Sequence, residues 1–365
     1  MRITNKMLTS RYTRDLNKSL SNLNTQSQKV DTGRKFFKGS EDPIGAVKAY
    51  RLRREYLKNE DYLTNIQEAD SIFTSAESNL MGINSNLNSV YLSYLKGING
   101  DKGMEERQII SAELKKVQES MLTTLNSTFN DKYLFSGASM EQPPFTVKAD
   151  ATIDPSNPDK TYLYYKGVNV SIADNDPAAG TLANDAYSKL EELSKESMYI
   201  DIGLSLQVDA NGKVDQNSVF DLAIPGINFL RFGKSLSDPS DPTSAKIPNN
   251  IYDLITDIRE ELGKDGTPGN EYSYDKIMPL IQNFEKQKNY NLKEITHMGA
   301  KANYLDFIKT RTDDNNINLS KKINDTEFID PAEAIMDWKM MQYSYTASLQ
   351  MGTKLIQPSF IDFMS

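Results

Sequence analysis

The chain contains a single histidine, His297, and this limits the catalytic chemistry that the sequence could perform. A zinc protease needs a His-Glu-x-x-His helix, and a Ser/His/Asp triad needs its imidazole beside a nucleophile and an orienting carboxylate. The segment Ile295-Thr296-His297-Met298-Gly299 offers neither arrangement. A lone histidine on a helix seam is more often a packed, hydrogen-bonded side chain, and we expect that role for His297.

Paired carboxylates are the other groups that could act in acid/base catalysis. They occur as Glu105-Glu106, Glu191-Glu192 and Glu260-Glu261, in charged helical stretches that are typical of solvated surfaces. The chain has no cysteine, which excludes disulfides and thiolate metal ligands, and no Gly-x-Gly-x-x-Gly or phosphate-loop spacing occurs. The sequence therefore predicts a protein without catalytic residues, bound metal or cofactor.

A long heptad repeat dominates the elements that would have to position any site. Apolar residues alternate at steps of three and four over four heptads, a pattern that keeps one narrow seam facing partner helices in a long bundle. These residues are Ile66, Ala69, Phe73, Ala76, Leu80, Ile83, Leu87, Val90 and Tyr94. We expect one helix from about Pro43 to Lys96, followed by a second helix that returns along it and ends near Gly137.

Shorter apolar seams occur near both ends of the chain. The first thirty residues are rich in Ser, Thr, Asn and Gln, which are indifferent helix formers, so this helix should be loose until neighbours close around it. We predict that both end helices form an assembly interface between molecules. Its residues are Ile3, Met7, Leu16, Leu20, Leu23, Val30, Trp338, Met341, Tyr345, Leu349, Leu355, Ile356, Phe360 and Phe363.

Glycine and proline interrupt the helical pattern at two places that we interpret as hinges between helical layers. Asp42 before Pro43 and Asp330 before Pro331 are also helix starts, because each pair supplies an N-cap acceptor followed by a residue without an N–H. The paired phenylalanines of the first hinge fit an intramolecular plug and an intersubunit contact equally well. The hinge residues are Gly33, Phe36, Phe37, Gly39, Asp42, Pro43, Asp330 and Pro331.

The middle of the chain changes character, because most of the prolines lie there and the helical period disappears. Thr161–Tyr165, the turn Lys166-Gly167 and Val168–Ile172 predict a β-hairpin, and Asn211-Gly212 marks a second turn. The fold class is therefore mainly α with an inserted β-rich module, in an elongated rod whose two ends meet at one pole. The predicted domains are an end helix at 1–35, a helical hairpin at 36–137, the module at 138–250, returning helices at 251–329 and an end helix at 330–365.

Charge and hydropathy exclude several classes of partner. The formal net charge of −8 argues against nucleic acid, because phosphate binding needs a basic face. No apolar run approaches the roughly 18 residues that span a bilayer, so we expect no membrane insertion. The N-terminus has no apolar core with a cleavage site, so any export would use no cleaved signal. Its basic, acid-poor composition is also typical of a mitochondrial presequence, but a presequence would not be matched by a helix at the far end.

Several blocks of residues near both ends resemble the flagellin superfamily, and most closely its members at the hook–filament junction. The two groups of blocks occur in the expected order over about 1–139 and 251–365, whereas the middle is the part that varies among such proteins. The blocks are Thr32–Arg34, Ser40–Ala46, Arg51–Arg53, Asn65–Ala69, Tyr133–Gly137, Asp330–Ile335, Tyr345–Gln350 and Ser359–Phe363.

The resemblance implies a bacterial structural protein, not an enzyme. Its expected location is extracellular, at the junction between hook and filament, after export through the flagellar type III apparatus with an export chaperone. Its expected partners are further copies of itself in a ring, the first hook–filament junction protein and flagellin. The end helices would form an inner coiled-coil layer, the hairpin and returning helices the next layer, and the module the outer surface. Pro358 departs from a regular helix and leaves the course of the tail open.

Two alternatives remain at this stage. The first is flagellin itself, although flagellins more usually have Asp-Asp-Ala-Ala-Gly where this chain has Asp42–Ala46. The second is a surface adhesin or an enzyme built on the module at 138–250, which no sequence feature supports.

Overall fold

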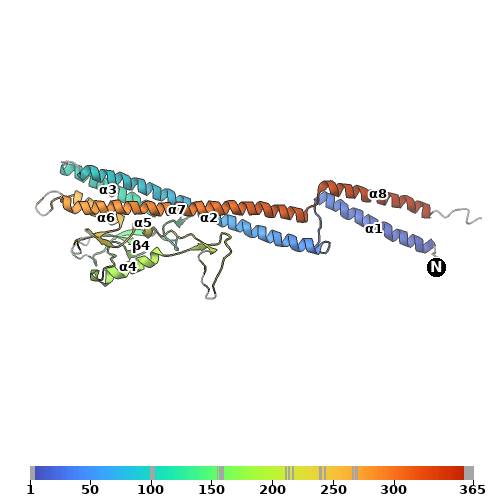
Figure 1. Ribbon diagram of the computed structural model, residues 1–365, viewed down its shortest axis with the longest axis horizontal. Coiled ribbons are helices and arrows are strands. Elements are labelled where there is room, and N and C mark those ends of the chain that lie inside the picture. The colour runs from blue at the N-terminus through green and yellow to red at the C-terminus, as the bar shows by residue number, and fades with distance from the viewer. Residues whose placement is uncertain are drawn as a thin grey trace, which may run out of the picture. The chain divides into compact units, whose positions relative to one another are not determined.

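The computed structural model describes residues 5–98, 103–153, 155, 160–209, 212, 214–215, 218–237, 241, 244–264, 267 and 270–356. The chain forms two compact units, one from residues 1–61 and 311–365 and the other from residues 62–310. Two long helices, α2 and α7, contribute residues to both units (Figure 1). The first unit contains the two end helices, and the second contains the inserted module.

The described elements are mostly helical, with short strands in the middle of the chain. The helices are α1 (Asn5–Thr32), α2 (Pro43–Ile98), α3 (Met104–Leu125), η1 (Pro177–Ala179), α4 (Thr181–Ser194), α5 (Gly226–Leu230), α6 (Ile251–Leu262), α7 (Tyr274–Glu327) and α8 (Pro331–Ile356). The strands are β1 (Thr128–Phe129), β2 (Lys132–Tyr133), β3 (Phe145–Ala149), β4 (Thr161–Tyr165), β5 (Val168–Asn169), β6 (Tyr199–Ile200), β7 (Phe220–Asp221), β8 (Lys234–Leu236) and β9 (Lys246–Pro248). No helix among the described residues is long and apolar enough to cross a membrane.

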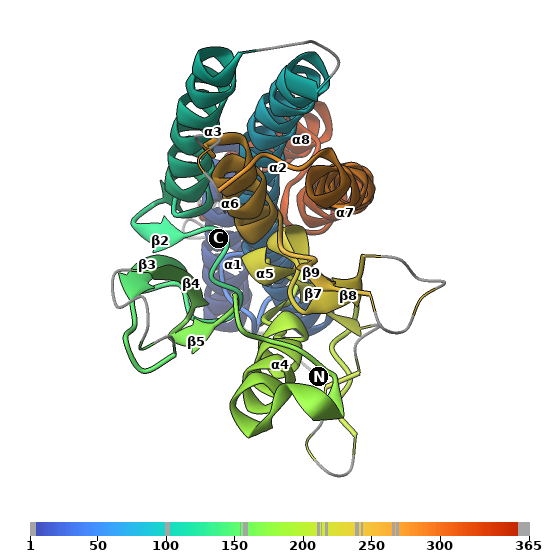
Figure 2. The ribbon, with the colours of Figure 1, turned by 90° about the vertical axis from the view of Figure 1, so that its left-hand side faces the viewer.

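The heptad seam of α2 is the centre of the second unit, as the sequence predicts. Every one of its nine positions from Ile66 to Tyr94 is at most 3% exposed. The Tyr94 ring packs edge-on against Phe284 of α7, with ring centroids 5.3 Å apart. The helical part of this unit lies on one side and the strands with α4 lie on the other (Figures 1 and 2). One continuous hydrophobic core lies between them, so the module packs directly against the helices.

One polar residue breaks the apolar seam of α7. Asn291 lies seven residues after Phe284 and four before Ile295, so all three share one helix face. Its side chain is fully buried, and neither its amide nitrogen nor its oxygen has a hydrogen-bond partner among the described residues. A buried polar group without partners is destabilising, and such a residue in a coiled-coil seam commonly fixes register at a cost in stability.

Asn291→Leu is therefore expected to raise the free energy of unfolding by about 1–3 kcal/mol, because it removes an unpaired buried amide from an apolar seam. Urea denaturation followed by circular dichroism measures the change. Asn289→Leu, at an exposed position on the same helix, serves as the control and should change the value by less than about 0.5 kcal/mol. A loss of stability in Asn291→Leu would show that the amide has a partner that compensates its burial.

The module contains the predicted hairpin. β4 pairs with β5 in antiparallel register, with Tyr165 opposite Val168, and β3 pairs along the other edge of β4. Lys166 and Gly167 both have positive φ values, +47° and +81°, as the two central residues of a type I′ turn require. Val208 and Val214 form an isolated bridge around the second predicted turn, of which Asn211 lies outside the described residues.

The predicted end of the second helix near Gly137 is wrong, because α3 ends at Leu125. The Asn126 amide donates to Phe145 O and accepts from Phe145 N, at 2.9 and 3.0 Å, which ties the helix end to β3. The chain then forms the hairpin β1–β2, whose turn residues Asn130 and Asp131 have φ values of +49° and +61°. This Asn-Asp pair is the signal that could have located the turn.

The module also contains a regular helix that the sequence analysis missed. Ala183, Ala186 and Leu190 of α4 are buried at helical spacing, whereas the outer face of the helix is exposed. Prolines on either side of this segment favoured an interpretation without helices, although its apolar residues recur with a helical period.

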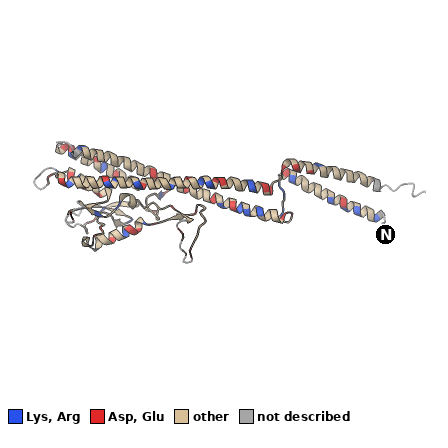
Figure 3. Ribbon diagram, in the orientation of Figure 1, with Lys and Arg blue, Asp and Glu red and all other residues tan. Residues whose placement is uncertain are grey.

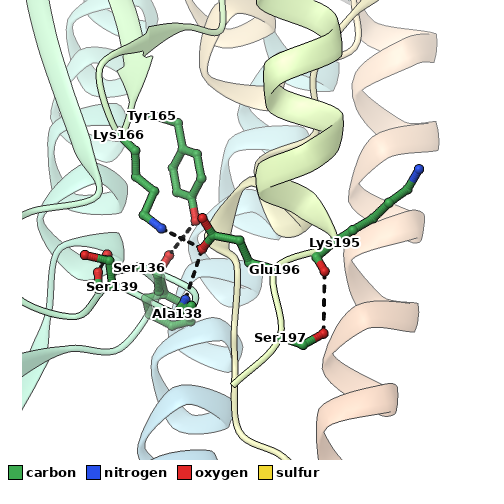
Figure 4. A network of polar contacts seen from close by, with 9 residues as sticks. Ser136, Ala138, Ser139, Tyr165, Lys166, Lys195, Glu196 and Ser197 are labelled. Carbon is green, nitrogen blue, oxygen red and sulfur yellow. Dashed lines mark hydrogen bonds and ion pairs between the residues drawn. The ribbon is translucent and has the colours of Figure 1, made fainter. Parts of the chain in front are cut away.

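The segment Tyr133–Gly137 joins the helices to the module (Figure 4). Phe135 O accepts from Gly226 N at 2.8 Å and from the Tyr165 hydroxyl at 3.3 Å, and Gly137 N donates to Ile224 O at 3.3 Å. Burial of the Tyr165 ring raises the pKa of its hydroxyl.

Glu196 closes the same network from the segment after α4 (Figure 4). Its carboxylate accepts from Ala138 N at 3.0 Å and forms an ion pair with Lys166 at 2.6 Å. Gly137 has a φ of +66°, and a Cβ added there would lie 2.6 Å from Glu196 Oε2. Glycine is required at this position for both its backbone conformation and the close approach of the carboxylate.

Gly137→Ala is expected to lower the free energy of unfolding by about 1–3 kcal/mol, because it adds a left-handed non-glycine residue and displaces Glu196. The control is Gly82→Ala, in the interior of α2, where an added Cβ meets nothing within 4 Å and alanine should stabilise the helix by about 0.5–1 kcal/mol. Chemical denaturation of both variants measures the difference. Equal stability of Gly137→Ala and the parent would contradict this role of the glycine.

Candidate assembly surface

The helices α1 and α8 pack against each other in the first unit (Figure 1). The Tyr12 hydroxyl donates to Ser348 O at 2.9 Å. Gly352 is buried directly against Tyr12, and a Cβ added at this glycine would overlap the tyrosine hydroxyl. The close packing of the Tyr12 side chain on Gly352 therefore helps to hold α1 against α8.

The predicted interface residues fall into three groups. Leu16, Leu23, Val30, Trp338 and Tyr345 are half-buried in the structure. Exposed members are Met7 at 65%, Leu20 at 38%, Met341 at 36% and Leu349 at 38%. The remaining predicted positions are Ile3, Phe360 and Phe363, which lie outside the described residues, and Leu355 and Ile356, which are helical but whose side chains are not described.

The structure adds exposed apolar side chains that the sequence analysis did not name. The most exposed are on α8, where Tyr343 is 78% and Met340 is 68% exposed. The others on the two end helices are Leu8, Ile335, Met336 and Met351. The adjacent pairs Ile335-Met336 and Met340-Met341 were the available signal, because neighbouring residues on a helix point in different directions and so make α8 apolar on more than one face.

The first unit buries little apolar surface of its own. Its buried apolar side chains, among the described residues, are Ala46, Ala49, Leu52, Leu319 and Ala334. None is larger than leucine, whereas the second unit buries many large aromatic and aliphatic side chains. Several large apolar side chains exposed on one helix pair are typical of a site of protein–protein contact.

Charge differs between the two end helices (Figure 3). Basic side chains are spaced along α1, whereas α8 has few charged residues after its acidic first turn. The basic charge of this helix pair therefore lies mainly on α1.

The two connectors that precede α2 and follow α7 are joined to each other by backbone hydrogen bonds. Arg34 and Phe328 form an antiparallel bridge, Lys35 N donates to Glu327 O at 2.7 Å, and Ile329 N donates to Gly33 O at 2.8 Å. Gly33 adopts a φ of +69°, which lets the chain turn directly after α1. The connector from α1 to α2 is thus hydrogen-bonded to the connector from α7 to α8.

Side chains reinforce this junction. The Arg53 guanidinium donates two hydrogen bonds to the Glu327 carboxylate, and this bonding raises the pKa of Arg53. The Asn59 amide donates to Thr312 O at 2.9 Å and to Asn316 Oδ1 at 2.8 Å. Charged and amide groups therefore help to hold α2 to α7 in this unit.

The predicted hinge residues lie together around this junction, although the structure does not test movement there. Asp42 Oδ1 accepts from Gly45 N at 2.9 Å and Asp330 Oδ1 accepts from Ala332 N at 2.8 Å, which confirms both predicted helix starts, with Pro43 and Pro331 as first residues. Gly39 is exposed.

Phe36 and Phe37 of the first connector differ in their environment. Phe36 is half-buried and Phe37 is 37% exposed. Both line a cavity of about 130 Å³ together with Ala46, Ala49 and Tyr50. The charged residues Arg34, Arg53 and Glu327 also line it.

The residues first considered for catalysis do not form a site. His297 is exposed on α7, so its predicted packing is wrong; Ile295, two residues earlier, faces the core instead. Glu261 also departs from the expected solvated face, because it is buried, accepts from Ser273 N at 2.9 Å and pairs with Lys264. The described residues contain no group of three or more His, Asp or Glu side chains placed to hold a metal ion.

Known proteins similar to this chain come from the bacterial flagellum. Residues 3–140 match the family model of the bacterial flagellin N-terminal helical region. Flagellar hook-associated protein 3 of Escherichia coli is 22% identical over 147 residues, which are 40% of this chain and 46% of that protein. The chain thus spans about half the length of this curated relative.

Solved structures share the fold over a larger part of the chain. A flagellar hook-associated protein from Vibrio parahaemolyticus has a TM-score of 0.55 at 16% identity, covering 79% of this chain and all of that one. Flagellar hook-associated protein 3 from Legionella pneumophila has a TM-score of 0.52 at 12% identity, covering 76% of this chain and 98% of that one. These structures confirm the mainly helical fold with an inserted β-rich module, and the family model together with the curated relative confirms the resemblance to the flagellin superfamily.

Proposed function

Because its residues 3–140 are similar to the flagellin N-terminal helical region, we propose that this chain is a structural subunit of the bacterial flagellum, at the junction between hook and filament. The observation that carries the proposal is the pair α1–α8, which exposes Met7, Met340 and Tyr343 in a unit with little apolar core of its own. Such surfaces are stable when copies of the same chain cover them. The role is mechanical and needs no catalytic group.

In this proposal the subunit is elongated and its parts form concentric layers. Residues 1–35 and 330–365 form the inner layer, 36–137 and 251–329 the second, and 138–250 the outer surface. The hinge residues at Gly33–Pro43 and Asp330–Pro331 set the angle between the inner two layers.

The proposed partners follow from a place at the junction. Copies of the chain form a ring, with the first hook–filament junction protein on one side and flagellin on the other. The chain reaches this extracellular place through the flagellar type III export apparatus, with an export chaperone and without a cleaved signal peptide. The name of the curated relative, flagellar hook-associated protein 3, supports a place in the flagellum next to the hook.

Deletion of the gene in the source bacterium tests this role. We expect intact hooks, no filaments and flagellin released into the medium, with motility restored by the full chain. Electron microscopy and immunoblotting of the medium give the readout. Normal filaments in the deletion strain would overturn the proposal.

Filament flagellin is the second candidate, because the family match at 3–140 is to the flagellin N-terminal region itself. Copy number distinguishes the two functions. Quantitative mass spectrometry of sheared flagella should find this chain as a trace component beside a dominant flagellin. Recovery of this chain as the main component would replace the junction role with the filament role.

A further inference from the structure

A polar cavity of about 580 Å³ lies in the second unit between α7 and the segment from α5 to β9. Strands β8 and β9 and the helix α5 lie side by side near α7 in Figure 2. The residues that line the cavity and bear on its chemistry are Arg231, Ser235, Asn249, Lys286, Tyr290 and Lys293. None of them belongs to the assembly surface described above.

Arg231 enters this cavity from a strained backbone. Its φ and ψ are +65° and 175°, a conformation that is essentially restricted to glycine. The guanidinium carbon lies 3.9 Å from the centre of the Tyr290 ring, so the flat cation is stacked on the aromatic face. Stacking leaves the N–H groups at the edge of the guanidinium available to an acceptor, and strain of this kind clusters at ligand-binding sites.

A chain of amides forms the wall of the cavity. Asn249 Oδ1 accepts from Ser235 Oγ at 2.8 Å and from Gln287 Nε2 at 3.4 Å. Behind them, the buried Asn283 side chain accepts from Gln287 at 3.1 Å and donates to Pro248 O at 2.8 Å. These bonds fix the orientation of each amide, and Asn249, Ser235 and Gln287 line the cavity. Alternating donors and acceptors in fixed positions are suited to hydroxyl groups.

The cavity is cationic in an acidic protein. Arg231, Lys286 and Lys293 line it, and among the described residues none of the three forms an ion pair. The lining also contains one carboxylate, that of Glu285. The whole chain has a net charge of −8, so this excess of positive charge is local.

We propose that this cavity binds an acidic saccharide, a sugar that carries a carboxylate. The guanidinium N–H groups of Arg231 donate hydrogen bonds to the carboxylate, and Lys286 and Lys293 supply further positive charge. Asn249 and Ser235 bond the hydroxyl groups. A neutral sugar would leave the excess of positive charge in the lining without counter-charge, and a bare anion would make no use of the amide wall. The volume lies in the range of small-ligand sites.

The test titrates the full chain with trigalacturonic acid, maltotriose and sodium acetate, followed by isothermal calorimetry. We expect saturable binding of trigalacturonic acid, and binding weaker by at least about tenfold in Arg231→Gln and in the double variant Lys286→Gln with Lys293→Gln. Lys288→Gln is the matched control, because Lys288 lies over the Tyr91 ring and does not line the cavity. It should bind like the parent.

A second variant separates the role of the strained backbone from simple folding. Arg231→Gly relieves the strain, so its thermal midpoint should be no lower than that of the parent while trigalacturonic acid binding is lost. No saturable binding of trigalacturonic acid to the parent chain would overturn the proposal. So would maltotriose or acetate binding as tightly as the acidic sugar. Neither result would bear on the junction role, which depends on different residues.

Discussion

Replacement of Gly352 by leucine is expected to abolish motility and filament formation in cells that depend on this chain. Gly352 is buried against Tyr12, and even a Cβ there would overlap the tyrosine hydroxyl, so a leucine must separate α1 from α8. The arrangement of the exposed apolar side chains on the two helices is then lost. Soft-agar motility and electron microscopy of a complemented deletion strain measure the effect.

Two further variants make this prediction specific. Gly82→Leu adds the same side chain at an exposed position of α2 where a Cβ meets nothing within 4 Å, and it should leave motility intact. Tyr12→Ala combined with Gly352→Leu removes the overlap and should restore part of the motility. Full motility with Gly352→Leu alone would mean that the α1–α8 pair is not needed for assembly.

The second large effect is a dependence of stability on pH that arises at α6. Asp253 Oδ1 accepts from the Ser171 hydroxyl at 2.9 Å, whereas Oδ2 is sealed from solvent without a partner among the described residues. Burial raises the pKa of Asp253 to about 7, and burial together with the nearby Glu260 raises the pKa of Asp257 to about 6. Both groups therefore keep their protons to a higher pH in the folded state than in the unfolded chain.

The folded chain therefore holds protons that the unfolded chain has already lost above about pH 4. The stability that these groups contribute is present below that pH and is lost as pH rises through about 6 to 7. We expect the free energy of unfolding to fall by about 2–4 kcal/mol between about pH 5 and pH 8. Urea denaturation at several pH values measures this slope.

Asp253→Asn should flatten the slope, since the amide does not ionise. Asp185→Asn, at an exposed position of α4, is the matched control and should leave the slope unchanged. Asp150 and Asp176, whose pKa values are lowered chiefly by hydrogen bonds from Thr152 and Lys246, act in the opposite sense and only at lower pH. Stability that rises steadily from pH 5 to pH 8 would contradict the burial of an ionisable Asp253.

The long helices could be predicted from the sequence because one physical constraint acts along their whole length. The seam from Ile66 to Tyr94 needs an apolar residue at every position that faces a partner, and all of these residues are buried. The helix starts at Pro43 and Pro331 were also predictable, because an aspartate cap before proline is a local signal. The type I′ turn at Lys166-Gly167 is another local signal.

Features that depend on distant residues could not be read in the same way. The end of α3 is set by hydrogen bonds between Asn126 and Phe145, and the need for Gly137 is set by Glu196. The exposed face of α8 was underestimated because the sequence analysis counted one seam, whereas Met340 and Tyr343 lie off it. No local signal marked Arg231, because its ring partner Tyr290 is far away in the sequence and arginine gives no hint of a positive φ.

Hydrogen exchange of α1 and α8, compared between the purified monomer and isolated flagella, is the most direct measurement of whether these helices are completed by neighbouring copies. We predict fast exchange over Asn5–Thr32 and Pro331–Ile356 in the monomer and strong protection of the same amides in flagella, while the seam from Ile66 to Tyr94 is protected in both. Equal, strong protection of both end helices in the monomer would contradict the account, because it would show that the chain completes this surface by itself.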